Sequence, residues 1–210
     1  MGYTVFDSAK DGLAARMTFF VPVGENCEIH DLVLTNETQE DKEVHLYGCM
    51  EWCLWNAVDD STNYQRNLNI AECEAEERIL YHKTEYRERR DHYAYYAVNR
   101  DTAGWDTDRN TFLGPMGDWS APALVERESS AFSCTTGWYP IGCHHLKIAL
   151  APGESQRVIF LLGYGKNPRD RKFLSPGVIR KDDAHAAAAK YADPAAVDAA
   201  FAALGRYWDS

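Results

Sequence analysis

Hydrophobic and polar residues alternate along much of the chain, and this alternation predicts β-strands. Residues 13–21 (Leu-Ala-Ala-Arg-Met-Thr-Phe-Phe-Val) form one such stretch, which Pro22 and Gly24 end. Residues 27–35 form a second stretch, and a polar turn at 36–41 closes it. This part of the chain therefore predicts two neighbouring strands.

A longer alternating stretch at residues 44–55 has two different faces. A strand with one apolar and one mixed face must be covered by another element or line a cleft. We therefore expect Trp52 to pack in a core, while Trp55 fits either core packing or contact with a ligand. The mostly apolar face carries Val44, Leu46, Gly48, Met50, Trp52 and Leu54, and the mixed face carries His45, Tyr47, Cys49, Glu51, Cys53 and Trp55.

Further short strands are expected at residues 70–77, 79–86 and 93–98, followed by a long irregular segment at 104–121. Near the end of this region, residues 145–150 alternate, the sequence Ala-Pro-Gly-Glu forms a turn, and residues 157–164 alternate again. Such a pair of strands around a short turn predicts an antiparallel hairpin.

The pattern changes to a helical one after Asn167. Residues 182–191 are rich in alanine, and Asp193 followed by Pro194 is typical of a helix start. The predicted architecture is mainly β: an antiparallel β-sandwich over residues 1–167, with a helical tail over 168–210. One apolar stripe along the last helix contains Val197, Phe201, Leu204 and Trp208.

The composition agrees with a mainly β fold and argues against some classes of partner. The chain has 210 residues, of which 45% are hydrophobic, and its twelve Tyr, eight Phe and six Trp favour strands. Its net charge of -10 argues against nucleic acid or an anionic membrane as the main partner. No apolar run approaches the ~20 residues that a membrane span needs.

The cysteines and the start of the chain suggest a cytoplasmic protein. Met1 is followed by polar residues, which is unlike a secretory signal. The six cysteines are therefore expected to be free thiols. Cys143 precedes His144 and His145, but neighbouring strand residues point to opposite faces, so no metal site is expected there.

Two blocks combine aromatic rings with amide, carboxylate and guanidinium groups. They are residues 51–67 (Glu-Trp-Cys-Leu-Trp-Asn-Ala-Val-Asp-Asp-Ser-Thr-Asn-Tyr-Gln-Arg-Asn) and residues 81–93 (Tyr-His-Lys-Thr-Glu-Tyr-Arg-Glu-Arg-Arg-Asp-His-Tyr). Rings can cover the apolar face of a sugar, and bidentate polar groups can bind its hydroxyls. The blocks therefore indicate a saccharide or polyol site.

The order of residues in these blocks resembles the amino-terminal domain of the cellobiose phosphorylases, inverting glycoside phosphorylases of glycoside hydrolase family ninety-four. The likeness runs from Gly2 to Trp208. The specific stretches are Phe19-Phe-Val-Pro22, Cys53-Leu-Trp-Asn-Ala57, Tyr64-Gln-Arg-Asn67, Tyr81 to Tyr93, Phe112-Leu-Gly114, Gly137-Trp138, Pro140-Ile141 and Leu162-Gly-Tyr164.

The resemblance implies a large sandwich of the supersandwich, galactose-mutarotase-like form. In the family a helical linker joins it to an (α/α)6 catalytic barrel, so residues 168–210 are expected to be the start of that linker. Members of the family also begin earlier than this chain. We therefore expect a truncated gene product, a split reading frame or an isolated domain that is inactive alone.

The implied reaction cleaves cellobiose with inorganic phosphate as co-substrate, giving α-glucose 1-phosphate and glucose with inversion. The general acid, an Asp, belongs to the barrel, so no catalytic residue and no further cofactor is expected here. The family's Gln-Arg pair at the acceptor-sugar subsite corresponds to Gln65 and Arg66, with Trp55 and Tyr64 as secondary contacts. The implied partners are the barrel, a sugar (cellobiose or glucose) and a second copy in a homodimer.

Two other functions remain open at this stage. A stand-alone carbohydrate-binding sandwich would hold a saccharide without chemistry. A sandwich enzyme related to sugar mutarotases would need a His and a Glu that converge in a cleft, and no motif fixes such a pair.

Overall fold

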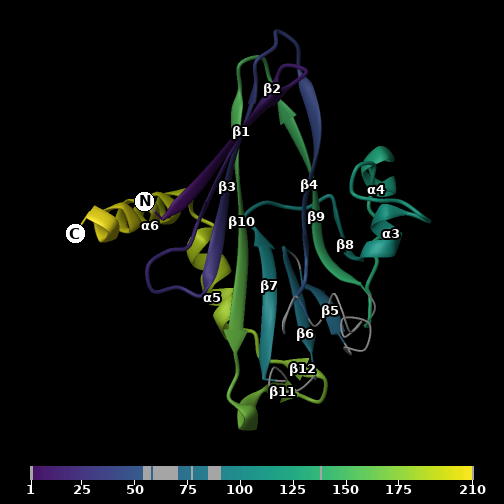
Figure 1. The fold of residues 1–210 in the computed structure, drawn as a ribbon, viewed down its shortest axis with the longest axis vertical. Coiled ribbons are helices and arrows are strands. Elements are labelled where there is room, and N and C mark those ends of the chain that lie inside the picture. The colour runs from purple at the N-terminus through teal and green to yellow at the C-terminus, as the bar shows by residue number, and fades with distance from the viewer. Residues whose placement is uncertain are drawn as a thin grey trace.

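The computed structural model describes residues 2–53, 58, 71–76, 78–84, 91–137 and 139–209. Its strands stack in two layers, a seven-stranded sheet with the order β1-β2-β3-β10-β7-β6-β5 and a three-stranded sheet with the order β4-β9-β8 (Figure 1). Every strand pair within these two sheets is antiparallel. The predicted antiparallel β-sandwich is confirmed. The strands are β1 (Tyr3–Lys10), β2 (Leu13–Phe20), β3 (Cys27–Asn36), β4 (Lys42–Glu51), β5 (Ala71–Glu76), β6 (Ile79–Thr84), β7 (His92–Val98), β8 (Gly104–Asp108), β9 (Pro140–Leu150) and β10 (Ser155–Lys166).

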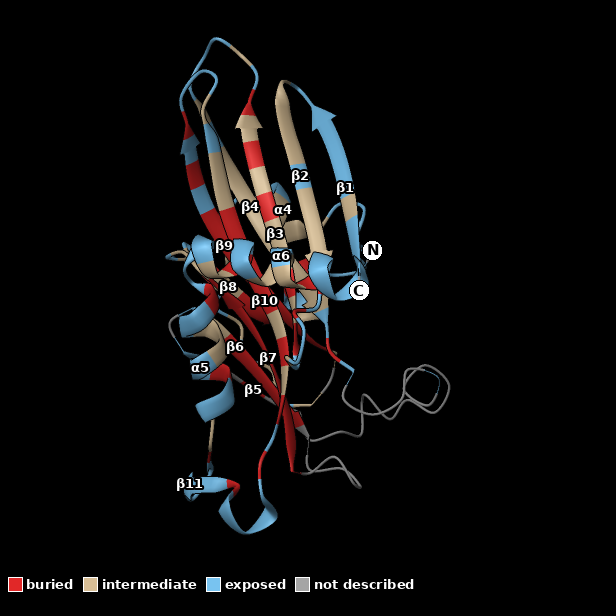
Figure 2. Cartoon of the chain, turned by 90° about the vertical axis from the view of Figure 1, so that its left-hand side faces the viewer, coloured by how far each residue is buried: buried red, intermediate tan, exposed pale blue. Residues whose placement is uncertain are grey.

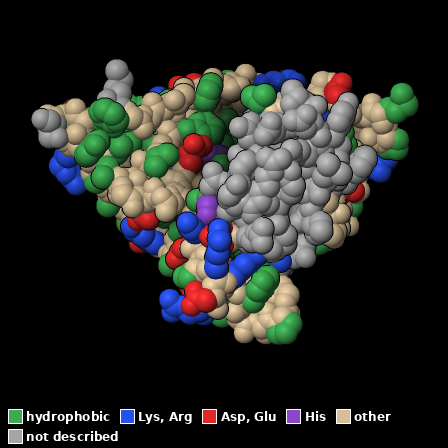
Figure 3. All heavy atoms as spheres, turned by 60° about the horizontal axis from the view of Figure 1, so that its bottom comes forward, with side chains coloured by type: hydrophobic (Ala, Val, Ile, Leu, Met, Phe, Trp, Pro, Cys, Tyr) green, Lys and Arg blue, Asp and Glu red, His purple; other side chains and the backbone are tan. Residues whose placement is uncertain are grey.

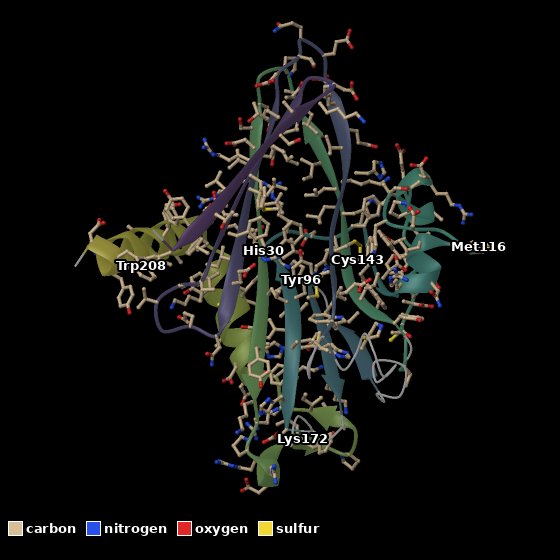
Figure 4. The ribbon with its side chains drawn as sticks, viewed as in Figure 1. His30, Tyr96, Met116, Cys143, Lys172 and Trp208 are labelled. Atoms are coloured by element: carbon tan, nitrogen blue, oxygen red, sulfur yellow. A yellow bond between two sulfur atoms is a disulfide. The ribbon has the colours of Figure 1, made fainter. Side chains whose placement is uncertain are left out.

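The main core lies between the two sheets. Leu32 of β3, Tyr96 of β7 and Phe160 of β10 face Leu146 and Ile148 of β9. The rings of Tyr96 and Phe160 stack with centroids 5.6 Å apart, and Figure 4 places Tyr96 in the centre of the molecule. Burying each large apolar side chain stabilises the fold by roughly 1.5–3 kcal/mol. Figure 2 shows the buried residues concentrated in the central strands, with β1 exposed at the sheet edge.

Helices cover the outer faces of both sheets. On the seven-stranded sheet lie α5 (Asp182–Tyr191) and α6 (Pro194–Asp209), and on the three-stranded sheet lie α3 (Arg109–Leu113) and α4 (Ala123–Glu126). A short 3-10 helix, η2 (Arg169–Arg171), and a small hairpin of β11 (Phe173–Ser175) and β12 (Val178–Ile179) connect β10 to α5. None of the helices in the described ranges has the length and apolar character of a bilayer-spanning helix.

The predicted helical tail is confirmed. The helix α5 has the predicted bounds, and α6 begins at Pro194, where Asp193 Oδ1 accepts a hydrogen bond from the Ala195 amide at 2.9 Å. Of the apolar stripe, Val197 and Leu204 are buried against the sheet. Trp208 lies at the far end of α6 beside Gly2, where an added Cβ would stand 2.2 Å from the Trp208 Nε1, and the side chain is 56% exposed (Figure 4).

The predicted hairpin of residues 145–150 and 157–164 is wrong, although both strands exist. β9 pairs with β4 and β8, whereas β10 pairs with β3 and β7 in the other sheet. The turn at 151–154 therefore crosses from one layer to the other. Both strands are apolar enough to face the shared core, and a local pattern cannot tell which strands become their partners.

Several elements, among them β8, α3 and β1, lie where no regular structure was predicted. Residues 104–121 were expected to be irregular, but β8 and α3 occupy their first part. Asp108 caps α3 because its carboxylate accepts hydrogen bonds from the Asn110 amide and the Thr111 hydroxyl, at 3.0 and 2.9 Å. β1 was not predicted at all, and its exposure on both faces explains why its apolar pattern is weak.

The expectation of free thiols is wrong for two cysteines. Cys49 of β4 and Cys143 of β9 are directly opposite in the sheet register and form a disulfide. The mixed face of β4 was expected to be covered or to line a cleft, and the structure shows a cover, because Tyr47 and Cys49 pack under α3 and α4. The strand ends at Glu51, shorter than the predicted 44–55.

Alkylation without reduction tests the disulfide. When the chain is unfolded in denaturant before alkylation, we expect a peptide map to contain the Cys49–Cys143 cross-link, while Cys27, Cys73 and Cys134 carry the alkyl label. Because the bridge closes a separation of 94 residues, its reduction is expected to lower the free energy of unfolding by about 2–4 kcal/mol. Recovery of alkylated Cys49 and Cys143 from unreduced protein would contradict the assignment.

Stability is expected to depend on pH through buried histidines. Burial lowers the pKa of His82 to about 3 and that of His144 to about 4, below their ordinary 6.5. The unfolded chain then binds more protons than the folded one in this window, so the free energy of unfolding falls as pH drops below 6.5. Urea unfolding should show a loss on the order of 1–2 kcal/mol per buried histidine between pH 7 and 5.

The variant His144→Gln separates this effect from general acid sensitivity. His144 Nε2 bonds the Tyr96 carbonyl at 2.9 Å, and the glutamine amide can donate in its place without titrating. The difference between pH 7 and pH 5 should therefore shrink in the variant. An unchanged difference would show that His144 does not set the pH dependence.

Candidate functional site

Both aromatic and polar blocks of the sequence are rooted at one end of the sandwich. β4 ends at Glu51, and β5 begins with Ala71 opposite Thr84, the last residue of β6. β7 begins at His92, which pairs with Lys166 at the end of β10. Figure 3 shows this end of the molecule, where apolar, acidic, basic and histidine side chains gather beside the undescribed residues. We call this end the block edge.

A cleft of about 420 Å³ opens next to the block edge. Met50 of β4 and Trp52, which follows this strand, line it together with Leu162 and Tyr164 of β10, and carboxylates lie along its wall. An apolar wall with convergent polar groups is the usual composition of a small-molecule site. The carboxylates that line the cleft are Glu25, Glu28 and Glu51.

Ion pairs and hydrogen bonds fix the orientation of these carboxylates. Glu25 accepts from Lys190 Nζ at 2.5 Å, Glu28 pairs with His30 Nε2 at 2.7 Å, and Glu51 pairs with Arg109 Nε at 2.7 Å. A carboxylate held in this way keeps lone pairs for further donors, such as sugar hydroxyls.

Trp52 joins the two sheets at the root of the first block. Its ring stacks on His82 of β6 with centroids 5.5 Å apart and planes 18° apart, and the side chain is 5% exposed. On its other side lies Gly142 of β9, where an added Cβ would stand 2.8 Å from the ring, so a larger residue would displace it. The prediction that Trp52 packs in the core is confirmed.

A buried polar cluster lies at the root of the second block. Asp91 Oδ1 is 3.5 Å from His92 Nε2, and Arg169 Nε is 3.7 Å from Asp91 Oδ2. The Tyr164 hydroxyl is hydrogen-bonded to His92 Nδ1. Burial acts to raise the pKa of Asp91, but a backbone hydrogen bond and the cationic groups of His92, Lys166 and Arg169 hold it below its ordinary range. The hydrogen bond between His92 and Tyr164 ties the start of β7 to β10.

The predicted sugar-binding residues lie outside the described residues. This holds for Gln65 and Arg66 and for the secondary candidates Trp55 and Tyr64, so their roles stay predictions. The cleft residues Glu25 and Glu28 were missed, because single carboxylates at a strand start carry no distinctive spacing. Tyr164 belongs to a stretch that carries the family resemblance, and this was its signal. Within the described ranges, no three His, Cys, Asp or Glu side chains are grouped to hold a metal ion.

Comparison with known proteins settles the family. The model of the glycosyl hydrolase 94 supersandwich domain matches residues 1–194. The chain belongs to this family. The predicted resemblance is therefore confirmed at the family level.

The supersandwich domain is similar to two characterised phosphorylases. Over the whole length of this chain, it is 30% identical to the N,N'-diacetylchitobiose phosphorylase of Vibrio proteolyticus. Over 91% of this chain, it is 28% identical to the solabiose phosphorylase of Paenibacillus borealis. It covers 24% and 26% of these proteins, so the chain spans about a quarter of the length of the relatives it matches.

A solved structure repeats the fold. The putative kojibiose phosphorylase from human microbiome superposes with a TM-score of 0.51 over 90% of this chain and 20% of that chain. At 7% identity this likeness concerns the fold alone. None of these names specifies cellobiose, so the disaccharide remains a matter for proposal.

Replacing Trp52 tests its place between the sheets. Trp52→Ala removes a buried ring and is expected to lower the free energy of unfolding by about 3–5 kcal/mol. Trp119→Ala is the matched control, because Trp119 is 43% exposed and should cost about 1 kcal/mol or less. Equal losses in urea unfolding of the two variants would contradict the packing of Trp52.

Proposed function

We propose that this supersandwich domain supplies acceptor-sugar contacts to an inverting disaccharide phosphorylase. The observation that carries the proposal is that the described ends of both blocks lie at the block edge, in a chain of this family. In the sequence, residues 52–70 stand between β4 and β5, and residues 85–91 stand between β6 and β7. Side chains from both blocks are therefore rooted close to one another.

The proposed reaction transfers a glucosyl unit from cellobiose to inorganic phosphate. A carboxylic acid of the catalytic barrel protonates the glycosidic oxygen while phosphate attacks the opposite face of the sugar, which inverts the configuration. This domain binds and orients the departing glucose. Arg66 is proposed to donate to two neighbouring hydroxyls through its planar guanidinium group, and Gln65 to assist it.

Cellobiose is our first choice of disaccharide because the two blocks resemble the cellobiose enzymes. The relatives named above act on other disaccharides by their names, so the test compares substrates. An unsubstituted glucose offers hydroxyls to the carboxylates of the cleft, whereas an N-acetylglucosamine would bring a bulkier acetamido group to the same wall. We propose that a second copy associates with this domain, as in the predicted homodimer.

Kinetics on the longest natural reading frame that contains this chain test the proposal. Phosphate-dependent release of α-glucose 1-phosphate is expected with cellobiose. In the reverse direction, Arg66→Ala should raise the KM for glucose at least tenfold and leave the KM for α-glucose 1-phosphate unchanged, because only acceptor binding is lost. Arg127→Ala is the matched control, since Arg127 is an exposed arginine beside α4, on the far face of the three-stranded sheet.

Each other outcome has a distinct meaning. Preference for N,N'-diacetylchitobiose would overturn cellobiose but keep phosphorolysis. An unchanged KM for glucose in Arg66→Ala would overturn the acceptor contact. Calorimetric binding of cellobiose by the isolated chain, lost in Arg66→Ala, without phosphorolysis by the full reading frame, would favour the stand-alone binding module instead.

A further inference from the structure

A segment that we call the strap, residues 128–134, crosses the outer face of the three-stranded sheet. It follows α4 and lies over β8, far from the cleft in sequence. Buried Asp106 of β8 accepts three hydrogen bonds from it: from the Ala131 amide at 3.2 Å, the Ser133 amide at 3.0 Å and the Ser133 hydroxyl at 2.7 Å. At Gly104 an added Cβ would lie 2.4 Å from the Ser130 Cβ. The strap can therefore pack against β8 here only because Gly104 has no side chain.

Two residues of the strap have a strained backbone conformation. Glu128 and Phe132 both have a φ of 52°, in the left-handed region that non-glycine residues adopt at a cost. Such conformations persist where surrounding contacts over-determine them. The closed strap therefore depends on its anchors, and loss of one anchor favours release.

A chain of hydrogen bonds from two histidines provides another anchor. His45 Nδ1 lies 3.0 Å from His145 Nε2, and His145 Nδ1 lies 3.2 Å from the Ser130 hydroxyl. The His145 ring stacks on Tyr47, with centroids 4.4 Å apart and planes 7° apart. Tyr47 in turn donates from its hydroxyl to the Ser129 carbonyl at 3.2 Å. The two histidines thus touch the strap from β4 and β9 at once.

The hydrogen bond between His45 Nδ1 and His145 Nε2 has room for only one proton. A nitrogen–nitrogen hydrogen bond needs one donor and one acceptor. When His45 Nδ1 donates, neutral His145 accepts at Nε2 and keeps a proton on Nδ1 for Ser130. His45 Nε2 lies 3.4 Å from Glu43 and 3.7 Å from Glu128, so two carboxylates face this nitrogen.

A second proton breaks the arrangement. With both imidazoles charged, two N–H groups would face each other at 3.0 Å, and neither nitrogen could accept. Burial first, then His45 and Lys147, lowers the pKa of His145, so this charge is disfavoured while the strap is closed. Burial also raises the pKa of Asp106, so acid weakens the hydrogen bonds from the strap to Asp106 as well. The charged and titratable groups in and around the histidine pair and the strap are Glu43, His45, Tyr47, Asp106, Glu128, His145 and Lys147.

We propose that His45 and His145 form a proton-operated latch, which holds the strap closed while the pair shares one proton and releases it when the second arrives. The strap ends at Cys134, whose thiol donates to the Cys73 carbonyl of β5 at 3.1 Å. Release of the strap would therefore break a contact with β5, the strand that begins at the block edge. The latch stands on the geometry of β4, β8 and β9 and does not rest on the proposed acceptor contacts.

Amide hydrogen exchange as a function of pH tests the latch on the isolated chain. After correction for the intrinsic exchange rate, the amides of Ala131 and Ser133 are expected to be protected near pH 7.5. Between about pH 7 and about pH 5 they should exchange at least about tenfold faster, while amides of the β4–β9 pairing stay protected.

The variant His45→Gln isolates the histidine pair. A glutamine amide can present either an oxygen or an N–H to His145, so a charge on His145 no longer forces the pair apart. The strap amides of this variant should remain protected near pH 5. His30→Gln is the matched control, because His30 pairs with Glu28 on β3 away from the strap, and it should keep the pH response of the native chain.

Three outcomes would overturn the latch. The first is protection of the strap that does not change with pH. The second is release of the strap at pH 5 in His45→Gln, which would assign the effect to Asp106 alone. The third is loss of strap and β4–β9 protection together, which would mean that acid unfolds the domain as a whole.

Discussion

The apolar contact between the two sheets is the constraint on which the rest of the structure depends. β10 occupies a central place in the seven-stranded sheet, and its residues Val158 and Phe160 pack against Leu146 and Ile148 of the three-stranded sheet. The chain crosses between layers both after β3 and after β9, so neither sheet can form its core without the other. Because interiors pack densely, this contact also fixes the relative position of the strand ends.

Those strand ends form the block edge, where we propose that the acceptor sugar binds. The end of β4, the start of β7 and the end of β10 meet there, and the Trp52–His82 stack ties the small sheet to the large one at this place. A binding site built on strand ends inherits the rigidity of the core. The fold thus positions the roots of the two blocks, and the chemistry proposed for the family reaction depends on residues that extend from these roots.

Local signals predicted the parts of the structure that local interactions determine. The bounds of α5 and the start of α6 follow from alanine content, Asp193 and Pro194, and the mixed face of β4 indicated a cover or a cleft. Long-range partners could not be predicted in this way. The pairing of β9 with β4 instead of β10, and the disulfide of Cys49 with Cys143, join residues far apart in sequence. The sugar-binding residues predicted from order and composition in the first block lie outside the described residues and stay predictions. Glu25 and Glu28 reach the cleft only because β3 pairs with β10, which no local pattern indicates.

A crystal structure of the full natural protein with glucose bound in the acceptor position tests the central claim most directly. We expect the guanidinium group of Arg66 to lie within hydrogen-bonding distance, about 3 Å, of two glucose hydroxyls. We also expect Arg66 and the cleft beside β4 to be on the same side of the sugar. Glucose held by the catalytic domain, with no side chain of residues 51–67 or 81–93 in contact with it, would contradict the account.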